Sequence, residues 1–408
     1  MLWPRPGHGQ DPEEVLSLKG ALAAAYQDNP QMVEARARIG SAQGDLLTVR
    51  TWLNPELEAE VGGLKKNEAE ERRGHLDSIS IKQPFSPVGV RYLQTKMARN
   101  DVLAQEEMVK LTWAAVYADV RGLFSQIVLD QQSIRLAEDN ANALRQFFSN
   151  VQIRYQSGQV LKNDLNRAQI ELRKAESESL AAQRNLKVNK AGLNFLLGRP
   201  YDRPFEIREE LREESLSLDL EDLIRRAIAQ RPDLKAQALQ FDSSRKDVVR
   251  AELGRLPSFS LGFEKTDTAY DKDYAALVSI NVPLWNLNQG DVRKARARRT
   301  IEETKTDALK REIGLEVYRL FLNAEYAQSQ IHLLNQSLRE ANELLSLAHL
   351  RYREGKIGFT DYLDQVKTAA QAKVNYYEAL YDLERSINSL EVAIYTPLRQ
   401  EDFLHEKF

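Results

Sequence analysis

Residues 154–169 read RYQSGQVLKNDLNRAQ, and residues 351–369 read RYREGKIGFTDYLDQVKTA. With the two Arg-Tyr pairs aligned, the segments lie 197 residues apart, and Asp164 matches Asp361 at the same spacing. Self-similarity at a fixed, long spacing is the sequence signature of an internal repeat. These two stretches therefore predict that one structural unit occurs twice in the chain.

The repeat extends over most of the chain. Pro30 matches Pro232 and Pro55 matches Pro257, both at a spacing of 202 residues. A shorter loop and a shorter turn in the second copy would account for the smaller spacing near the repeat ends. We therefore predict a disordered N-terminus at 1–11, a first repeat at 12–205, a charged linker at 206–217, a second repeat at 218–397 and a C-terminal tail at 398–408.

Both copies contain a long segment with a seven-residue period. Apolar or small residues recur at Val120, Ile127, Ile134, Ala141, Phe148 and Tyr155, and again at Val317, Ala324, Ile331, Leu338, Leu345 and Tyr352. The segments that follow keep this period, and a strict heptad indicates a left-handed supercoil. Each copy is thus predicted to form an antiparallel coiled-coil hairpin, at about 89–198 and about 289–396. At 1.5 Å per residue, the first long helix would reach on the order of 100 Å.

Two pairs of short segments with period two precede the long helices. We predict strands at about 52–63 and 76–86 in the first copy, and at about 256–266 and 274–284 in the second. Each strand is about ten residues long, the length that a tilted strand needs to cross a hydrocarbon layer, and one face is apolar. Four strands cannot close a barrel, but three chains would supply twelve, an even number found in outer-membrane barrels. A homotrimer would also gather twelve helical staves, four per chain, into a hollow cylinder.

Composition excludes several classes of function. The 57 basic and 60 acidic residues are mixed along the chain, with a formal net charge of −3, so no basic field exists to hold nucleic acid. No window approaches the roughly 18 consecutive apolar residues of a membrane-spanning helix. The chain has no cysteine, which suits an oxidising compartment.

The sequence offers no catalytic centre. The five histidines are scattered, without a carboxylate or second histidine at a ligand spacing that repeats across the copies. Gly62 and Gly290 are expected in turns beside strands, and neither is followed by the Lys-Ser/Thr of a phosphate-binding loop. We therefore expect no enzyme activity, no catalytic residue, no metal site and no cofactor.

From about Leu16 to Pro397 the chain resembles the TolC family of outer-membrane efflux proteins, and the two stretches quoted first resemble the periplasmic helix-turn-helix tips of that family. PLWNLNQG at 283–290 resembles the strand-to-helix junction of the heavy-metal branch, the partners of cobalt-zinc-cadmium and copper-silver pumps. The resemblance implies a mainly α fold with a small β part. It also implies a trimeric duct with a 12-stranded β-barrel in the outer membrane of a Gram-negative bacterium and an α-helical barrel in the periplasm.

The resemblance also implies roles for individual residues. Asp361 and Asp364 would form acidic rings at the pore constriction, where carboxylates in a narrow throat attract cations. Asp164, Tyr352 and Lys356 would belong to an aperture latch, although Ile357 stands where some members place a latch arginine. Asp164 and Asp361 have an alternative role as helix N-caps. The tips that would dock a periplasmic adaptor hairpin include Gln156, Gly158, Lys162, Gly355 and Thr360.

The expected function is a passive conduit of a tripartite efflux system, with an adaptor protein and an RND-type inner-membrane pump as partners and outer-membrane lipid around the barrel. The expected cargo is metal cations. One alternative is a duct of the same family for drugs or other small molecules. A second is a soluble coiled-coil scaffold or adaptor, in which the strands would be small capping sheets. The apolar row of the second strand pair, Pro257 to Val282, argues against that scaffold, and the unbroken heptads argue against a refolding pore-forming toxin.

Overall fold

The structure is a computed structural model that describes residues 14–61, 76–213, 218–267, 272–399 and Leu404. The predicted disordered segment 1–11 and most of the predicted tail at 398–408 lie outside these residues. Helices make up most of the described chain, so the expected fold class, mainly α with a small β part, is confirmed.

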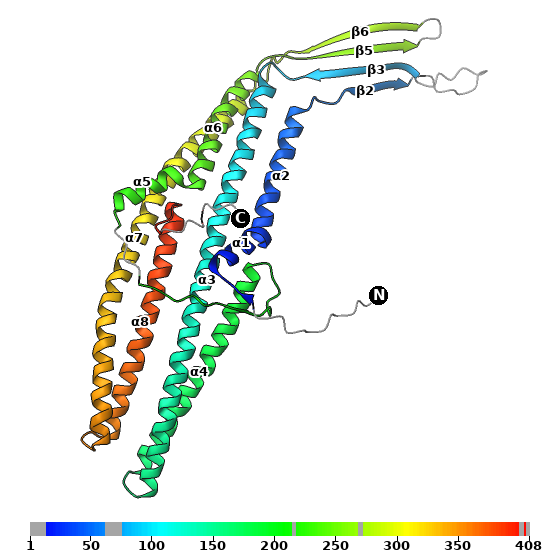
Figure 1. The fold of residues 1–408 in the computed structure, drawn as a ribbon. Helices are drawn as coiled ribbons and strands as arrows, with labels where there is room; N and C mark the ends of the chain where they lie inside the picture. The colour runs from blue at the N-terminus through cyan, green and yellow to red at the C-terminus, as the bar shows by residue number, and fades with distance from the viewer. Residues whose placement is uncertain (1–13, 62–75, 214–217, 268–271, 400–403, 405–408) are drawn as a thin grey trace, which may run out of the picture. The chain divides into compact units, whose positions relative to one another are not determined.

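The same order of elements occurs twice (Figure 1). The first copy contains α1 (Leu18–Asp28), α2 (Pro30–Arg50), β2 (Glu56–Val61), β3 (Leu76–Phe85), α3 (Val90–Gln156) and α4 (Lys162–Leu196). The second copy contains α5 (Leu220–Gln230), α6 (Pro232–Leu253), β5 (Ser258–Asp267), β6 (Lys272–Asn281), α7 (Gln289–Arg353) and α8 (Phe359–Ile394). Two further short strands, β1 (Glu14–Val15) and β4 (Phe205–Glu206), pair in parallel.

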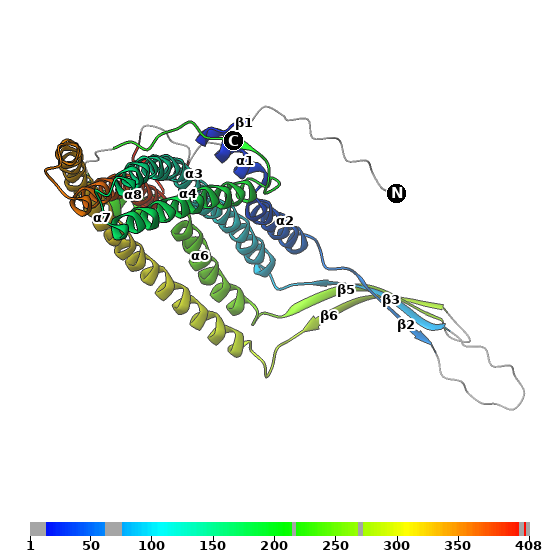
Figure 2. The same cartoon turned by 90° about the horizontal axis from the view of Figure 1, so that it is seen from below.

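The chain divides into two compact units. The first comprises 1–34, 109–231 and 311–408, and the second comprises 35–108 and 232–310. In the first unit, α3 turns back into α4 and α7 turns back into α8 (Figure 1). In the second unit, the strands β2, β3, β5 and β6 continue from the ends of α2, α3, α6 and α7 (Figure 2).

The heptad positions explain why the long helices form hairpins. α3 has 67 residues and α7 has 65. No proline and one glycine, Gly122, interrupt α3, so that its ladder of hydrogen bonds is unbroken. Val120, Ile127, Val317 and Ile331 on the predicted seams are almost fully buried. The seam between α3 and α4 also contains one buried carboxylate, Asp130. It accepts hydrogen bonds from Asn189 of α4 at 2.6 Å and from Gln126.

A buried charge network joins α3, α8 and the segment after α8 in the first unit. The Arg121 guanidinium lies 3.1 Å from a Glu384 carboxylate oxygen and 3.7 Å from Glu391, and Arg399 contacts the same two carboxylates at 3.0 and 3.7 Å. Arg121 also donates a hydrogen bond to the Tyr117 hydroxyl at 2.6 Å. Buried charges require such pairing, because an unpaired charge in an apolar interior is strongly unfavourable.

The sheet of the second unit is antiparallel, in the order β2-β3-β5-β6. Its register places Leu57 opposite Ile81, and Ile81 opposite Phe263. Because side chains alternate along a strand, this register collects the apolar rows of all four strands on one face and polar residues, including Glu58 and Lys82, on the other.

The junction PLWNLNQG is a turn with defined chemistry. Asn288 has a positive φ of 56°, which Asn tolerates better than most residues, and its side-chain amide donates a hydrogen bond to the Ala251 carbonyl at 2.7 Å. Gly254 lies against that amide, and a Cβ at this glycine would come within 2.5 Å of the Asn288 Nδ2 atom. The motif therefore fixes how β6 enters α7 next to the end of α6.

Candidate functional site

The turns at the ends of the two hairpins belong to the first unit and share one backbone design. Gly158 and Gly355 have positive φ values of 73° and 71°. The N–H group of each glycine bonds back to a carbonyl of the preceding helix, at Tyr155 and Tyr352. Glycine ends a helix in this way because the left-handed conformation has no Cβ penalty there. The predicted tip residues Gln156, Gly158, Lys162, Gly355 and Thr360 all lie at these turns and are exposed.

The aspartates lie just inside the helices that follow these turns. α4 begins after Leu161 and α8 begins after Gly358, so that Asp164 and Asp361 are each the third residue of a helix. The N-cap alternative is wrong for both aspartates, because Leu161 and Gly358 are the N-caps and each helix begins two residues before its aspartate. The Asp164 carboxylate instead reaches back to accept a hydrogen bond from the Leu161 N–H at 3.4 Å. Asp361 and Asp364 are exposed and lie about one turn apart on the same side of α8.

Of the predicted latch residues, Tyr352 makes contacts with both hairpins. Its ring stacks on Tyr362 with a centroid distance of 4.7 Å, and the Arg154 guanidinium lies 5.0 Å above it. Burial raises the pKa of Tyr352, the positive charge of Arg154 opposes that shift, and the negative charge of Asp164 adds to it. Tyr352 and Asp164 are therefore close enough to interact electrostatically. Lys356 forms its ion pair with Glu354 on its own turn, at 2.7 Å.

An aromatic tip cluster, Phe147, Tyr352, Phe359 and Tyr362, joins the two hairpins. Phe147 of α3 is buried, and its ring lies 5.1 Å from Phe359, 5.3 Å from Tyr362 and 5.7 Å from Tyr352 between centroids. Aromatic pairs at these distances contribute about 0.5–1.5 kcal/mol each beyond their buried area. The cluster therefore holds α8 against α3 within one chain.

An ion pair lies beside the aromatic tip cluster. The Lys367 ammonium of α8 is 2.6 Å from a Glu171 carboxylate oxygen of α4. Sequence reasoning missed Phe147, Phe359, Glu171 and Lys367. The available signal was the pair Phe359 and Tyr362, which are three residues apart and therefore share one side of α8.

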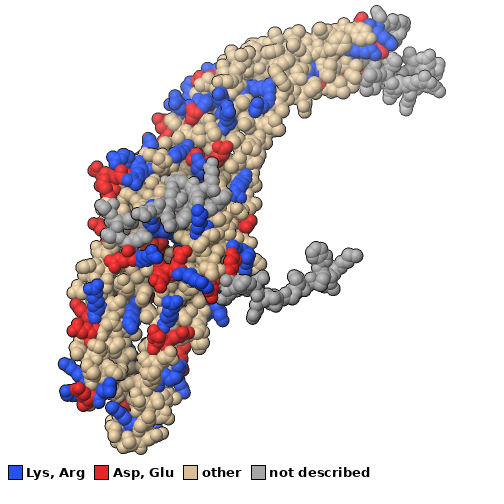
Figure 3. All heavy atoms as spheres, viewed as in Figure 1, with Lys and Arg blue, Asp and Glu red and all other residues tan. Residues whose placement is uncertain are grey.

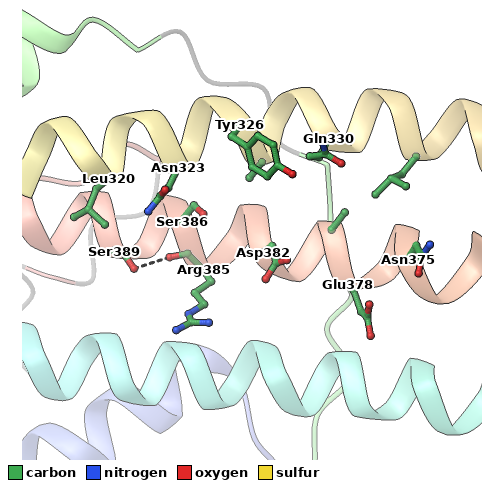
Figure 4. Close-up of a pocket in the computed structure, with 13 residues that line it drawn as sticks. Leu320, Asn323, Tyr326, Gln330, Asn375, Glu378, Asp382, Arg385, Ser386 and Ser389 are labelled. Carbon is green, nitrogen blue, oxygen red and sulfur yellow. Dashed lines mark hydrogen bonds between the residues drawn. The ribbon is translucent and has the colours of Figure 1, made fainter.

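A groove of about 710 Å³ runs between α7 and α8, away from the turns (Figure 4). Its lining is mostly polar and includes Asn323, Gln330, Asp382 and Arg385. Figure 4 shows Arg385 and Glu378 directed away from α7. No cluster of three or more His, Asp or Glu residues suited to a metal ion occurs in the described parts of the chain.

The apolar face of the sheet is the second candidate site. Leu57, Ile81, Phe263, Val278 and Ile280 are all about half exposed or more. A contiguous apolar face of this kind marks a surface that binds another apolar phase or protein. Within the described residues, no helix is both long enough and apolar enough to span a membrane.

Comparisons with known proteins agree with this architecture. The model of the family described as outer membrane efflux protein matches residues 21–199 and 223–394, one match for each repeat. The cobalt-zinc-cadmium resistance protein CzcC of Cupriavidus metallidurans is 24% identical over 377 residues, which cover 90% of this chain and 86% of CzcC.

Solved structures show the same fold. CusC, described for its transmembrane channel formation, has a TM-score of 0.80 at 16% identity, with 92% of this chain and 91% of CusC covered. The CmeC outer membrane channel of Campylobacter jejuni has a TM-score of 0.79 at 14% identity, with 97% and 93% covered. The open state of the MtrE outer membrane channel of Neisseria gonorrhoeae has a TM-score of 0.75 at 17% identity, with 94% and 90% covered.

Proposed function

This chain belongs to the outer membrane efflux protein family, and on that premise we propose that three copies form the outer-membrane channel of a tripartite efflux system. The channel is a passive conduit from the periplasm to the exterior, and metal cations are its cargo. A periplasmic adaptor and an RND-type inner-membrane pump complete the system and supply the energy.

The exposed apolar face of the sheet carries this proposal. The order β2-β3-β5-β6 leaves β2 and β6 at the edges of one chain's sheet. Open edges are unfavourable in a hydrocarbon layer because their N–H and C=O groups lack partners. Three copies provide twelve strands, and pairing β6 of one copy with β2 of the next closes the ring. The apolar face then meets lipid, and the polar face lines the lumen.

The aspartates of α8 give the conduit its preference for cations. Asp361 and Asp364 are exposed and share one side of the helix, so that three copies would present six carboxylates at the narrow end. Such rings attract cations and repel anions. The latch that holds this end closed consists of Asp164, Tyr352 and Lys356. The turns at Gln156, Gly158, Lys162, Gly355 and Thr360 are the docking surface for the adaptor.

The likeness to CzcC supports metal cations as the cargo, because that relative is a cobalt-zinc-cadmium resistance protein. A wide, water-filled duct leaves the choice of cargo to the pump. Deleting the gene from its host should therefore lower tolerance to cobalt, zinc or cadmium. Unchanged tolerance to all three metals, with lost tolerance to organic compounds, would favour the drug-efflux alternative.

The assembly is tested by cross-linking the full-length chain in native membranes and measuring its mass in detergent. A trimer in the outer-membrane fraction supports the proposal, whereas a monomer that stays soluble without detergent contradicts it and favours the scaffold alternative.

The acidic rings are tested by single-channel conductance in planar bilayers. Asp361→Asn with Asp364→Asn should reduce the preference for cations over anions. Asp139→Asn, at an exposed position along α3, is the matched control and should keep the preference of the native chain. An unchanged preference in the double variant would remove the ring assignment.

A further inference from the structure

The helix ends that adjoin the sheet in the second unit carry an excess of positive charge. Four stretches flank the strands, at 44–55, 86–98, 248–257 and 282–299, and together they contain ten Lys and Arg residues against three Asp and Glu residues. The whole chain has a net charge of −3. Basic residues are therefore concentrated at these ends, which we call the basic collar. Figure 3 shows blue side chains on the helices beside the mostly tan strands.

The start of α7 is the most basic part of the collar. Residues 289–299 read QGDVRKARARR, with five basic residues and one acidic residue. Val292 and Ala295 are buried against Ala251 of α6, which leaves the basic side chains on the surface. Lys294 is 83% exposed and Arg298 is 69% exposed.

Neighbouring carboxylates neutralise part of this charge. Lys294 pairs with Asp291 at 3.5 Å, Arg296 pairs with Glu252 at 2.9 Å, and Arg298 lies 3.6 Å from Asp247. Exposed ion pairs of this kind are held together only weakly. The basic residues of the collar also outnumber its acidic residues. A net positive field therefore remains at the helix ends.

Aromatic side chains lie between the collar and the apolar face of the sheet. Trp285 is 88% exposed and Trp52 is 65% exposed. The Trp52 ring packs edge-on against Phe85 at 5.6 Å, and the Arg91 guanidinium lies 4.2 Å above the same ring. Phe85 in turn stacks on Phe259 at 5.0 Å. Tryptophan is typical of the boundary between hydrocarbon and headgroups, because its ring is apolar and its N–H is polar.

We propose that the basic collar binds the anionic phosphate headgroups of phospholipids in the leaflet that faces the helices. Along α7, Lys294 lies about 8 Å and Arg298 about 14 Å from the first residue of the helix. The Debye length is about 8 Å at physiological salt, so Arg293 and Lys294 lie within about one Debye length of a charged surface at the start of the helix. The arrangement thus runs from lipid-facing strands, through interfacial tryptophans, to cations at headgroup depth. This inference rests on the proposed channel, because it requires the sheet to be in a membrane.

The test uses the full-length chain reconstituted into bilayer nanodiscs made from an equimolar mixture of phosphatidylglycerol and phosphatidylcholine. Native mass spectrometry counts the lipids of each kind that remain bound. The native chain should retain phosphatidylglycerol preferentially. The variant Arg293→Gln, Lys294→Gln, Arg296→Gln should lose this preference on the order of 100-fold, given the contribution of each basic residue near an anionic surface.

A matched control removes three charges farther along the same helix, with Lys305→Gln, Lys310→Gln and Arg319→Gln. These side chains are exposed and begin about 16 Å beyond Lys294, so the control should bind lipid as the native chain does. Inorganic phosphate added in excess should not replace the lipid. Equal retention of both lipids by the native chain, or equal preference in the collar variant and the control, would overturn the proposal.

Two further measurements separate this proposal from the proposed function. Single-channel conductance should persist in the collar variant, and if the native chain gives no conductance, the channel itself is contradicted and not the collar alone. Trp285 fluorescence should be quenched by lipids brominated near the headgroup. The same measurement on Trp285→Phe gives the contribution of the other three tryptophans. Absence of quenching in a conducting channel would place the junction outside the bilayer and contradict the collar.

Discussion

Phe147 of α3 and Phe359 of α8 stack with ring centroids 5.1 Å apart and an angle of 28° between the planes. They lie 212 residues apart in the chain and belong to different repeats. This contact connects the two hairpins next to the turns where the proposed channel is narrowest. Interactions inside one chain therefore hold α8 against α3, and opening the proposed channel by moving α8 would have to break them.

The variant Phe359→Ala should favour the open channel. It removes the stacking of one ring on Phe147 and its packing against the aromatic tip cluster, which together amount to about 1–3 kcal/mol. That change would shift a closed-to-open equilibrium roughly 5- to 150-fold. Single-channel recordings should show a higher open probability or conductance. Phe195→Ala, at a position 67% exposed, is the control, and equal recordings from both variants would contradict the prediction.

The ion pair between Lys367 and Glu171 should also stabilise the closed state of the proposed channel, by a smaller and salt-dependent amount. Both side chains are partly exposed, so a coupling of about 0.2–1 kcal/mol is expected. Lys367→Glu should raise the conductance at low salt and have less effect at high salt, because salt screens the repulsion. The double variant with Glu171→Lys should restore native behaviour. Failure of the double variant to restore it would mean that the pair does not act in closure.

The order of elements could be predicted from the sequence because each element repeats its own period. Seven-residue spacing along α3 and α7 shows which side of a helix is buried, and the two-residue alternation at Phe259 and Ile280 shows which face of a strand is apolar. The repeat then gives the same order twice. For these reasons the strands and long helices lie close to their expected positions.

Contacts between the repeats could not be predicted in the same way. A heptad does not say which other hairpin a helix meets, so the neighbours of Phe147 were not predictable from spacing. The pattern of charges along a helix also does not predict which charged side chains are buried. Glu391 is only 2% exposed and lies between Arg121 and Arg399. A lone charged residue in a helix is usually solvated, and only the fold shows this exception.

The variant Gly254→Ala should destabilise the junction between the sheet and α7. A Cβ at this position would lie 2.5 Å from the Asn288 Nδ2 atom and 3.3 Å from the Ala251 carbonyl oxygen, which accepts the Asn288 hydrogen bond. Relieving this overlap should cost about 1–3 kcal/mol and lower the midpoint of thermal unfolding. Gly290→Ala is the matched control, because no atom lies within 4 Å of its added Cβ. Equal midpoints for the two variants would contradict the role given to the turn.

Tyr117 should make stability depend on pH in the alkaline range. Burial raises the pKa of Tyr117 to about 12, with Arg121 opposing the shift, whereas an unfolded tyrosine titrates near 10. Because the folded pKa is the higher one, the neutral phenol stabilises the fold fully below about pH 10, and this contribution is lost as the pH rises through 12. Tyr117→Phe also loses the hydrogen bond from Arg121, so it should be less stable than the native chain at pH 8. The native chain should then lose up to roughly 2–3 kcal/mol relative to Tyr117→Phe toward pH 12, so that the difference between the two disappears or reverses. The midpoints of thermal unfolding, measured from pH 8 to 12, check this prediction. Trp113→Phe is the control, because tryptophan does not titrate, and its midpoint should change with pH as that of the native chain does. A constant difference between Tyr117→Phe and the native chain over that range would show that the buried phenol does not control the alkaline loss.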